Sequence, residues 1–290
     1  MSILLDKNTR VIVQGITGKI GAVQTRWMLD YHTRIVGGVT PGKGGSTVEG
    51  CPVFDSVAEA VVQTKANASV FFVPAAFVLD AFLETVDAGI KFIVIVPEHV
   101  PVHDVMKMRA YARQNNVFAL GPTTPGILVP GVGKMGIMPG SLFTPGKVGI
   151  ISRSGTLAYE FAGILSDAGI GQSAVVGMGA DPVVLSNLTD ILERFEEDAE
   201  TDAVVVVGEV GGEQEENAAA YIAKHMTKPV ASYIAGRHSP EGKRMGHAGA
   251  IVRGSVGTAE SKIKALTEAG IPVLNSPIET ADWARELQLN

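Results

Sequence analysis

Short apolar runs alternate with amphipathic stretches along the whole chain, and this alternation predicts its secondary structure. In the first half, runs rich in Val, Ile and Phe predict buried strands, at 10–14, 34–39, 69–73, 92–96 and 117–120. Apolar residues at helical spacing predict helices between them, at about 19–30, 56–64, 76–88 and 102–114. Strands that alternate with helices are typical of a parallel sheet covered on both faces, so we expect an α/β, Rossmann-like first domain.

The same alternation resumes in the second half of the chain. Apolar runs predict further strands, at 148–152, 172–177, 203–208 and 229–235. Helices are expected at about 155–167, 185–196 and 213–225, and a helix, a strand and a helix from 258 onward. This pattern predicts a second doubly wound domain.

A segment rich in proline and glycine, Gly121–Lys147, separates the two halves. Because proline removes a backbone donor and glycine weakens regular structure, we expect neither a helix nor a regular strand to run through it. A chain of 290 residues can also hold two cores, since single cores stop growing near ~250 residues. We therefore expect domains at 1–121 and 147–290, joined by a Pro/Gly-rich linker at 122–146.

The composition limits the possible partners and location. The formal net charge is −6 and no run of Lys or Arg occurs, which argues against nucleic acid or an anionic membrane as the main partner. The apolar runs are far shorter than the ~20 residues of a membrane-spanning helix. The apolar N-terminal stretch is interrupted at Asp6 and Lys7, and the single cysteine, Cys51, cannot form an internal disulfide. We expect a cytoplasmic protein that acts on small molecules or other proteins.

A glycine cluster lies where the first strand turns into the first helix. Gly15, Gly18 and Gly21 form G-x-x-G-x-x-G, and such a turn lets a ligand approach the backbone and the helix amides bind an anion. A NAD site would also require an acid after the second strand, but the side chain there is Lys43. A lysine favours a ribose phosphate, as in NADP or the 3'-phosphate of coenzyme A. A tight turn without a ligand is the alternative.

The segment Gly37–Lys43 matches the start of a phosphate-binding G-x-x-x-x-G-K loop but does not complete it. Gly44 stands where a Ser or Thr would bind magnesium, and no helical pattern follows. We therefore expect no nucleotide-hydrolysis loop in this chain.

Two further strand ends carry candidate polar groups. Ser154, Gly155 and Thr156 begin a helix, where they form either an anion pocket or an ordinary N-cap. Glu209 lies at the carboxyl edge of a predicted strand, where α/β ligand sites occur. The acids that follow it are expected to line a solvated first helical turn, namely Glu213, Glu215 and Glu216.

His247 is the histidine with the most distinctive surroundings. Pro101 between His99 and His103 spoils a helical metal-ligand pair, so no metal site is expected. A Ser-His-acid hydrolase is disfavoured because the G-x-S-x-G turn is missing. His247 lies between Gly246 and Ala248-Gly249. With a carboxylate and an anion-binding helix start it could form a nucleophilic imidazole that accepts a phosphoryl group, and the alternative is a buried structural histidine.

Five motifs in register over essentially the whole chain carry a family resemblance. "QGITG", "GGVTPGKGG", "SRSGTLAYE", "GEVGG" and "GKRMGHAGAI" closely resemble the α subunit of succinate-CoA ligase, in the nucleoside-diphosphate-forming acyl-CoA ligase superfamily. The resemblance implies a Rossmann-like CoA-binding domain and a flavodoxin-like ligase domain. It also implies an obligate β subunit, in an αβ or α2β2 assembly, whose ATP-grasp domain binds the Mg-nucleotide, either ATP or GTP.

The resemblance also assigns roles to residues of this chain. His247 would be the phosphohistidine, Glu209 the acid that orients it, and the helix start at Ser154, Gly155 and Thr156 the phosphate-binding group. Tyr159 would lie near the carboxylic acid substrate. A larger set would meet CoA: Thr17, Gly18, Lys19, Ile20, Lys43, Val96, Pro97 and Glu98. The implied reaction phosphorylates His247, passes the phosphate to a carboxylic acid, and forms a thioester with CoA.

Several loops depart from the family pattern. Thr123 and Thr124 in "GPTTPG" replace an Asn and a Cys near the acid site, and they are candidate substrate-binding residues. "VPE" at 96–98 precedes His99 where a glycine is usual, and Ala180 and Leu185 replace glycines. The acid could therefore be succinate, or malate, citrate, a sulfonated acid or another short polar acid. Two different classes of function stay open beside the ligase: a non-catalytic CoA- or NADP-binding regulatory module, and an NADP-dependent dehydrogenase.

Overall fold

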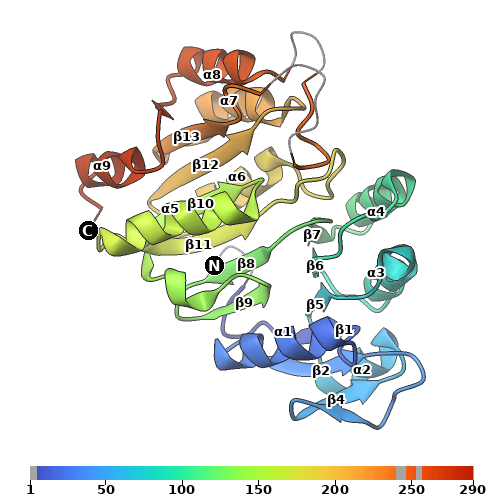
Figure 1. The fold of residues 1–290 in the computed structure, drawn as a ribbon. Coiled ribbons are helices and arrows are strands. Elements are labelled where there is room, and N and C mark those ends of the chain that lie inside the picture. The colour runs from blue at the N-terminus through green and yellow to red at the C-terminus, as the bar shows by residue number, and fades with distance from the viewer. Residues whose placement is uncertain (1–4, 240–245, 253–256, 290) are drawn as a thin grey trace. The chain divides into compact units, whose positions relative to one another are not determined.

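The computed structural model in Figure 1 describes residues 5–239, 246–252 and 257–289. The chain forms two compact α/β units. Within the described ranges, the first unit consists of residues 5–138 with 183–186, and the second of residues 139–182 and 187–289. No helix among the described residues is both long and apolar enough to cross a membrane.

The first unit contains a seven-stranded sheet in the order β3-β4-β2-β1-β5-β6-β7. Its neighbouring strands are parallel except for the antiparallel pair β3 and β4. The expected strands are confirmed, and β3 and β4 are additional. The strands are β1 (Val11–Gln14), β2 (Ile35–Val39), β3 (Thr47–Val48), β4 (Cys51–Phe54), β5 (Ala68–Phe71), β6 (Phe92–Ile95) and β7 (Phe118–Leu120).

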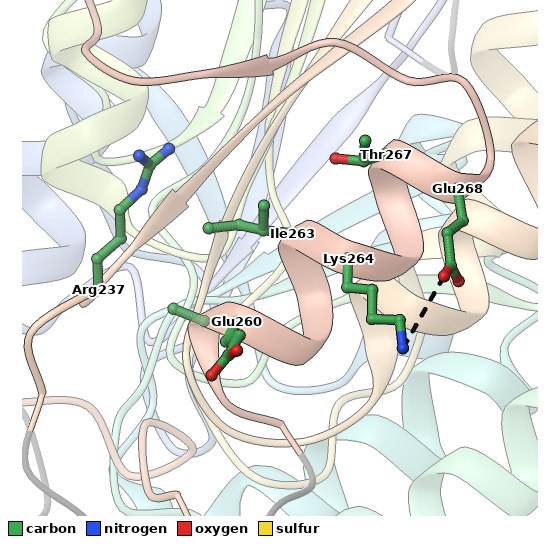
Figure 2. Close-up of a pocket in the computed structure, with 7 residues that line it drawn as sticks. Arg237, Glu260, Ile263, Lys264, Thr267 and Glu268 are labelled. Carbon is green, nitrogen blue, oxygen red and sulfur yellow. Dashed lines mark ion pairs between the residues drawn. The ribbon is translucent and has the colours of Figure 1, made fainter.

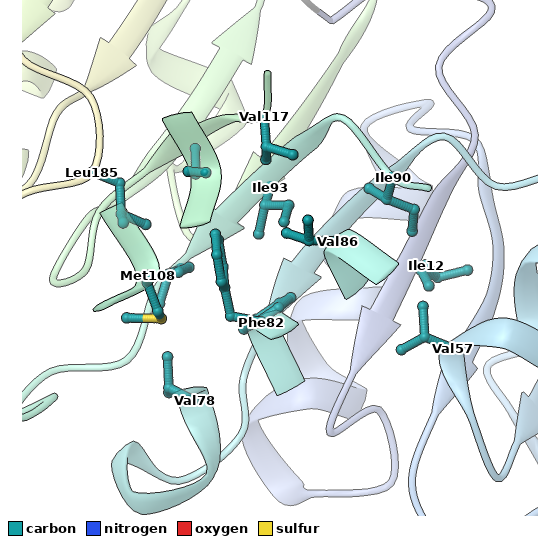
Figure 3. Close-up of a cluster of buried hydrophobic side chains, with 14 of the residues drawn as sticks. Ile12, Val57, Val78, Phe82, Val86, Ile90, Ile93, Met108, Val117 and Leu185 are labelled. Carbon is teal, nitrogen blue, oxygen red and sulfur yellow. The ribbon is translucent and has the colours of Figure 1, made fainter. Parts of the chain in front are cut away.

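Helices cover both faces of this sheet. They are α1 (Lys19–Asp30), α2 (Val57–Thr64), the 3₁₀ turn η1 (Ala75–Phe77), α3 (Val78–Asp87) and α4 (Val102–Gln114). α2 packs on α3 and α3 on α4, whereas α1 packs on β1 and β2, as right-handed crossovers in opposite directions require. Figure 3 shows the buried cluster between strands and helices, with Phe82, Ile93 and Met108 at its centre.

The Pro/Gly-rich segment contains a hairpin, so the expectation that no regular strand runs through it is wrong. β8 (Gly126–Val129) pairs antiparallel with β9 (Gly133–Gly136). The prolines lie outside both strands, and the glycines make the pairing possible. A Cβ on Gly126, whose φ is +100°, would lie 1.9 Å from the Met135 carbonyl oxygen, so only glycine permits this approach.

The second unit repeats the doubly wound pattern, as predicted. Parallel strands follow the order β14-β13-β12-β10-β11. Its strands are β10 (Pro145–Ser152), β11 (Gln172–Gly177), β12 (Ala203–Glu209), β13 (Val230–Ala235) and β14 (Val273–Leu274). Its helices are the 3₁₀ turn η2 (Gly140–Leu142), α5 (Gly155–Asp167), α6 (Leu188–Glu197), α7 (Gln214–His225), α8 (Ala259–Glu268) and α9 (Glu279–Glu286).

The strand order places a topological switch point in each sheet. After β1 the chain moves first to β2 and later to β5 on its other side, and β10 likewise lies between β11 and β12. The segments that connect the strands then place helices on opposite faces of each sheet. In the second unit, α6 packs on α7 and α7 on α8, whereas α5 packs on α9. Ligands of open α/β sheets bind at the carboxyl ends of such strands.

Candidate active site

The carboxyl edge of the second sheet brings together groups that are far apart in the sequence. Glu209 is the last residue of β12, and Arg153 directly follows β10. Ser152 pairs with Val207 in the parallel register, and the Arg153 amide donates to the Val207 carbonyl at 3.2 Å. Glu209 and Arg153 therefore extend beyond the same carboxyl edge of the sheet, the edge at which Glu209 was predicted.

His247 contacts Glu209 through one ring nitrogen. Nδ1 of His247 lies 2.6 Å from Oε2 of Glu209, whose side chain is 8 % exposed whereas that of the histidine is 35 % exposed. A carboxylate only accepts hydrogen bonds, so this geometry assigns the proton to Nδ1 and leaves the lone pair on Nε2 in the neutral ring. Residues 242–245 of the "GKRMGHAGAI" motif lie outside the described residues.

A buried arginine holds the other side of Glu209. Arg153 Nη2 lies 3.4 Å from Glu209 Oε1, an oxygen without a hydrogen-bond partner among the described residues. Arg153 Nη1 donates to the main-chain carbonyls of Glu209 at 3.0 Å and Gly211 at 2.9 Å. The guanidinium therefore binds both the carboxylate and the backbone that carries it.

Glu215 was expected in a solvated helical turn, and that expectation is wrong. Its side chain is fully buried and accepts from Arg153 Nη1 at 3.1 Å and from the Glu209 amide at 3.1 Å. It also pairs with Lys262, another fully buried side chain, from α8. Burial alone would raise the pKa of the Glu215 carboxyl, but Arg153 and Lys262 outweigh burial and hold that pKa below its usual range.

The pKa of Arg153 is set by the same two opposing effects, and Lys262 completes the group of buried charges. Burial alone would lower the pKa of the Arg153 guanidinium, but Glu215 and Glu209 outweigh it and keep that pKa above its ordinary value. Lys262 also donates to the Gly212 carbonyl at 2.9 Å and pairs with Glu216 at 3.0 Å. Two buried cations therefore face two buried carboxylates, with half-buried Glu216 beside them.

Glycines allow the loops of this edge to approach each other. A Cβ on Gly249 would lie 3.2 Å from Arg153 Nη2, and one on Gly211 would lie 2.1 Å from the Gly249 carbonyl oxygen. Gly246 has a φ of +84°, a conformation that L side chains rarely adopt. The small residues around His247 thus make room for the arginine and the neighbouring backbone.

The helix start beside Arg153 has a side-chain cap. The Ser154 hydroxyl accepts from the Leu157 amide at 3.5 Å and lies 3.2 Å from the Thr156 hydroxyl. The first turn of α5 carries no acidic residue, so the positive end of its dipole is not neutralised there. The N-cap that sequence analysis considered for Ser154 is confirmed, and anion binding remains a prediction. Tyr159, further along α5, is half-buried beside Phe143 with ring centroids 6.3 Å apart.

In the first unit, the glycine cluster forms a tight turn at the carboxyl end of β1. Gly15 has a φ of +76°, and the Gly18 amide donates to its carbonyl at 3.0 Å. A Cβ on Gly21 would lie 2.2 Å from that same carbonyl oxygen, so α1 packs directly on the turn. Gly15 and Gly21 therefore have a structural reason to be glycine, whether or not a ligand binds, and a Cβ on Gly18 would lie 3.2 Å from the Gly15 carbonyl oxygen.

This turn leaves the start of α1 open. Gly18 is the N-cap and provides no side-chain cap, and no acid lies in the first turn. Lys19 and Ile20 are exposed, as is Lys43 beyond the end of β2. The Thr17 hydroxyl is close to that of Thr40, at 3.2 Å. Backbone amides and cationic side chains thus occur together at the switch point of the first sheet.

The two loops expected near CoA and the acid lie at the same edge. Val96 and Pro97 are half-buried after β6, Glu98 is exposed, and the Thr123 amide donates to the Pro97 carbonyl at 3.0 Å. Thr124 is buried, and its hydroxyl accepts from the Gly126 amide at 2.9 Å. The Thr124 hydroxyl therefore supports the turn that leads into β8.

A cavity of about 530 Å³ lies elsewhere in the second unit, along α8. Figure 2 shows Arg237 on one side and Ile263 with other α8 residues on the other, including the exposed pair Lys264 and Glu268. Its lining includes neither His247 nor Glu209. In the described ranges, no group of three or more His, Cys, Asp or Glu side chains could hold a metal ion.

Sequence reasoning did not identify Arg153, Glu215 and Lys262. One local signal was available for the arginine, because Arg153 immediately follows a predicted strand and precedes a predicted helix start, where α/β ligand sites occur. The burial of Glu215 and Lys262 depends on contacts across 47 residues of sequence, which no local pattern displays.

The sequence comparisons agree with the two units. Residues 6–99 match the CoA binding domain family and residues 151–272 match the CoA-ligase family. The succinate–CoA ligase [ADP-forming] subunit alpha 2 of Archaeoglobus fulgidus is 54 % identical over 99 % of this chain and 100 % of its own length. The corresponding subunit alpha of Methanothermobacter thermautotrophicus is 54 % identical over 98 % of this chain and 96 % of its own.

A solved structure has the same fold over nearly all of this chain. Methanosaeta concilii ATP citrate lyase in complex with (3S)-citryl-CoA matches with a TM-score of 0.89 at 26 % identity, over 98 % of this chain and 50 % of the lyase chain. Identity above one half with full-length relatives, together with both matching domain families, shows the family. The chain belongs to the succinate–CoA ligase α-subunit family.

Proposed function

We propose that this chain is the α subunit of a nucleoside-diphosphate-forming acid–CoA ligase that works through phosphorylated His247. The observation that carries the proposal is the 2.6 Å contact of His247 Nδ1 with the buried Glu209 carboxylate. This contact fixes the ring and keeps the Nε2 lone pair for attack on phosphorus. The family membership and the CoA-ligase match over 151–272 support the same reaction class.

The reaction proceeds in three balanced steps. His247 Nε2 attacks the terminal phosphorus of the nucleotide, and the P–O bond to the departing nucleoside diphosphate breaks. A carboxylate oxygen of the acid then attacks that phosphorus, and the P–N bond breaks to give an acyl phosphate. Finally the CoA sulfur attacks the acyl carbon, and inorganic phosphate leaves as the thiol proton is lost. Phosphate is needed because a carboxylate alone would have to expel oxide.

The first unit fits a CoA ligand. α1 begins at Gly18 without a side-chain cap or an acid in its first turn, so its amides can bind a phosphate. Lys19 and Lys43 are exposed near this turn and supply positive charge, while exposed Ile20 supplies apolar contact. Thr17, Val96, Pro97 and Glu98 lie at the carboxyl ends of β1 and β6 in the same sheet. The match of 6–99 to the CoA binding domain supports this placement.

The proposal requires a partner subunit. A β subunit with an ATP-grasp domain would bind the Mg-nucleotide, since Gly37–Lys43 is followed by Gly44 and leads into the β3–β4 hairpin instead of a helix. In this proposal, residues 1–121 form the CoA-binding domain, and residues 147–290 form the ligase domain that carries the phosphohistidine. Ser154, Gly155 and Thr156 would bind the phosphoryl group. A cytoplasmic location suits the nucleotide, acid and CoA substrates.

Succinate is the proposed acid, because the curated relatives carry that name. Tyr159 and Thr123 are the proposed contacts to the acid. Thr124 is the weaker candidate, since its hydroxyl already accepts from the Gly126 amide. Acyl-CoA formation by the assembled αβ complex, measured with succinate, malate, citrate and a sulfonated acid, tests the assignment. A preference of less than about tenfold for succinate, worth about 1.4 kcal/mol, would contradict it.

The catalytic proposal is tested by labelling. The αβ complex is incubated with nucleotide labelled in its terminal phosphate, and base-stable, acid-labile label on the α chain is counted. His247→Asn should abolish both label and thioester formation. The matched control is His32→Asn, at an exposed position with a φ of +65° that asparagine tolerates. Full label in His247→Asn would overturn the proposal, and a non-catalytic CoA-binding module would give none in the wild type.

A further inference from the structure

We propose that Arg153 is the positioning residue that holds the Glu209 carboxylate against His247. The inference deepens the proposed function and rests on it. In the proposed function, Arg153 contacts neither the nucleotide nor the acid. It would affect the phosphorylation step through Glu209 alone.

The buried carboxylate of Glu209 needs a neutralising cation. Its side chain is 8 % exposed, and a buried carboxylate is costly unless a cation neutralises it. Arg153 is the cation within 4 Å of its carboxylate among the described residues, at 3.4 Å from Oε1. The same carboxylate must remain an acceptor at Oε2, because the His247 Nδ1 proton is donated there. Arg153 thus stabilises the negative charge of the carboxylate beside Oε1, and Oε2 of the same carboxylate orients the imidazole.

The two terminal nitrogens of Arg153 contact different parts of the Glu209 loop. Arg153 Nη1 binds the carbonyls of Glu209 and Gly211, while Nη2 faces the Glu209 carboxylate. The guanidinium therefore fixes the backbone at the end of β12 together with the carboxylate. The planar, forked guanidinium reaches the carbonyls and the carboxylate from two separate nitrogen atoms, whereas a lysine would have to reach all of them from a single nitrogen.

Arg153 is itself held in place by a second buried ion pair. Glu215 binds Nη1 at 3.1 Å, and Lys262 binds Glu215 from α8. The Glu215 carboxylate also accepts from the Glu209 amide at 3.1 Å. This buried chain of Lys262, Glu215 and Arg153 (the Arg153 ion chain) ends at Glu209. Gly249 leaves the space that Nη2 occupies, since a Cβ there would lie 3.2 Å away.

Arg153→Lys is the test, because it keeps the charge and loses the fork. In single-turnover experiments with the αβ complex, His247 phosphorylation should slow by about ten- to a hundredfold, the cost of a displacement of about 1 Å. KM for nucleotide and for CoA should stay within about twofold, since neither ligand is bound by Arg153. Arg237→Lys is the matched control, an arginine that donates to the Leu274 carbonyl and Asn275 in the same unit. Equal rates for both lysine variants would overturn the inference.

A double-mutant cycle separates positioning from a merely structural role. If Arg153 acts through Glu209, Arg153→Lys should change the phosphorylation rate by less than about twofold once Glu209→Gln is present. A structural defect would slow both backgrounds equally. An additive loss would therefore contradict the inference.

The tautomer of His247 gives a readout that needs no nucleotide. In ¹⁵N spectra of the full chain, assigned with His247→Asn, the wild type should show protonated Nδ1 and unprotonated Nε2, and Arg153→Lys a mixture of tautomers. An unchanged spectrum in the folded variant overturns the inference. If Arg153→Lys does not fold, Arg153→Met with Glu215→Met removes one charge of each sign and leaves Lys262 paired with Glu216. A wild type with the expected tautomer but no phosphate would contradict the proposed function alone.

Discussion

The carboxyl edges of the two sheets in this chain are built in opposite ways. At the first edge, Gly15, Gly18 and Gly21 pack backbone against backbone, and the charged side chains nearby are exposed. At the second edge, Glu209 and the Arg153 ion chain are buried and paired. One doubly wound pattern therefore yields an open backbone site and a closed ionic site. Substitutions that add atoms should damage the first edge, whereas substitutions that remove a charge should damage the second.

Removing a charge from the ion chain should have the largest effect on stability. Lys262→Met leaves Glu215 with one cation fewer in a fully buried site, and breaking a buried pair costs about 3–5 kcal/mol. Lys264→Met on the same helix is the control, because that lysine is exposed and only 3.9 Å from Glu268. The free energies of unfolding in urea measure both. Similar losses would mean that the ion chain does not stabilise the fold.

Glu215→Gln should cost less, because Arg153 keeps Glu209 and Lys262 keeps Glu216 as carboxylate partners, and its cost should depend on pH. The change weakens charged hydrogen bonds worth about 1.5–3 kcal/mol near neutral pH. Because the folded-state pKa of Glu215 lies below its ordinary value of 4.5, its contribution is present above pH 4.5 and is lost as the pH falls through the folded pKa. The difference in unfolding free energy between wild type and variant should therefore shrink below that pH. A difference that grows there would contradict the sign.

Adding one methyl group should damage the first edge. Gly15→Ala forces a φ of +76° on alanine and places Cβ 3.0 Å from the Phe72 carbonyl oxygen, at a cost of about 1–2 kcal/mol. Gly89→Ala is the control, with a φ of +90° and no atom within 4 Å of the added Cβ. Both should lose stability, but only Gly15→Ala should weaken CoA binding by calorimetry, by about tenfold. Equal CoA affinities would place the ligand elsewhere.

Removing a charge at the first edge should hardly change stability. Lys43 is exposed, so Lys43→Met should alter the unfolding free energy by less than about 0.5 kcal/mol. Its expected effect is on the ribose phosphate of CoA: the variant should bind CoA more weakly and dephospho-CoA as the wild type does. If both ligands lose affinity equally, Lys43 does not contact that phosphate.

The same contrast explains what the sequence could predict. Strands such as 92–96 and 203–208 were predictable because their burial is a local, continuous apolar pattern. The glycine turn and the position of Glu209 followed from strand ends, which are also local. The short strands at 47–48, 51–54, 126–129 and 133–136 were missed, because glycine or proline flanks or interrupts these short runs.

The ionic site was predictable only in part. Glu215 occupies the first turn of α7, a position where acids usually face solvent. Its burial is decided by Arg153 and Lys262, which approach from β10 and α8. Only the folded sheet brings these three residues together. Likewise, His247 and Glu209 were both candidates, but their 2.6 Å contact is a property of the fold.

In the proposed reaction, Glu209 holds Nδ1 of His247 and leaves Nε2 to carry phosphate. Phosphorus NMR of the denatured α chain, after incubation of the αβ complex with nucleotide, distinguishes phosphate on the two ring nitrogens. We expect phosphate on Nε2 of His247 alone. Phosphate on Nδ1, or on a residue other than His247, would contradict it.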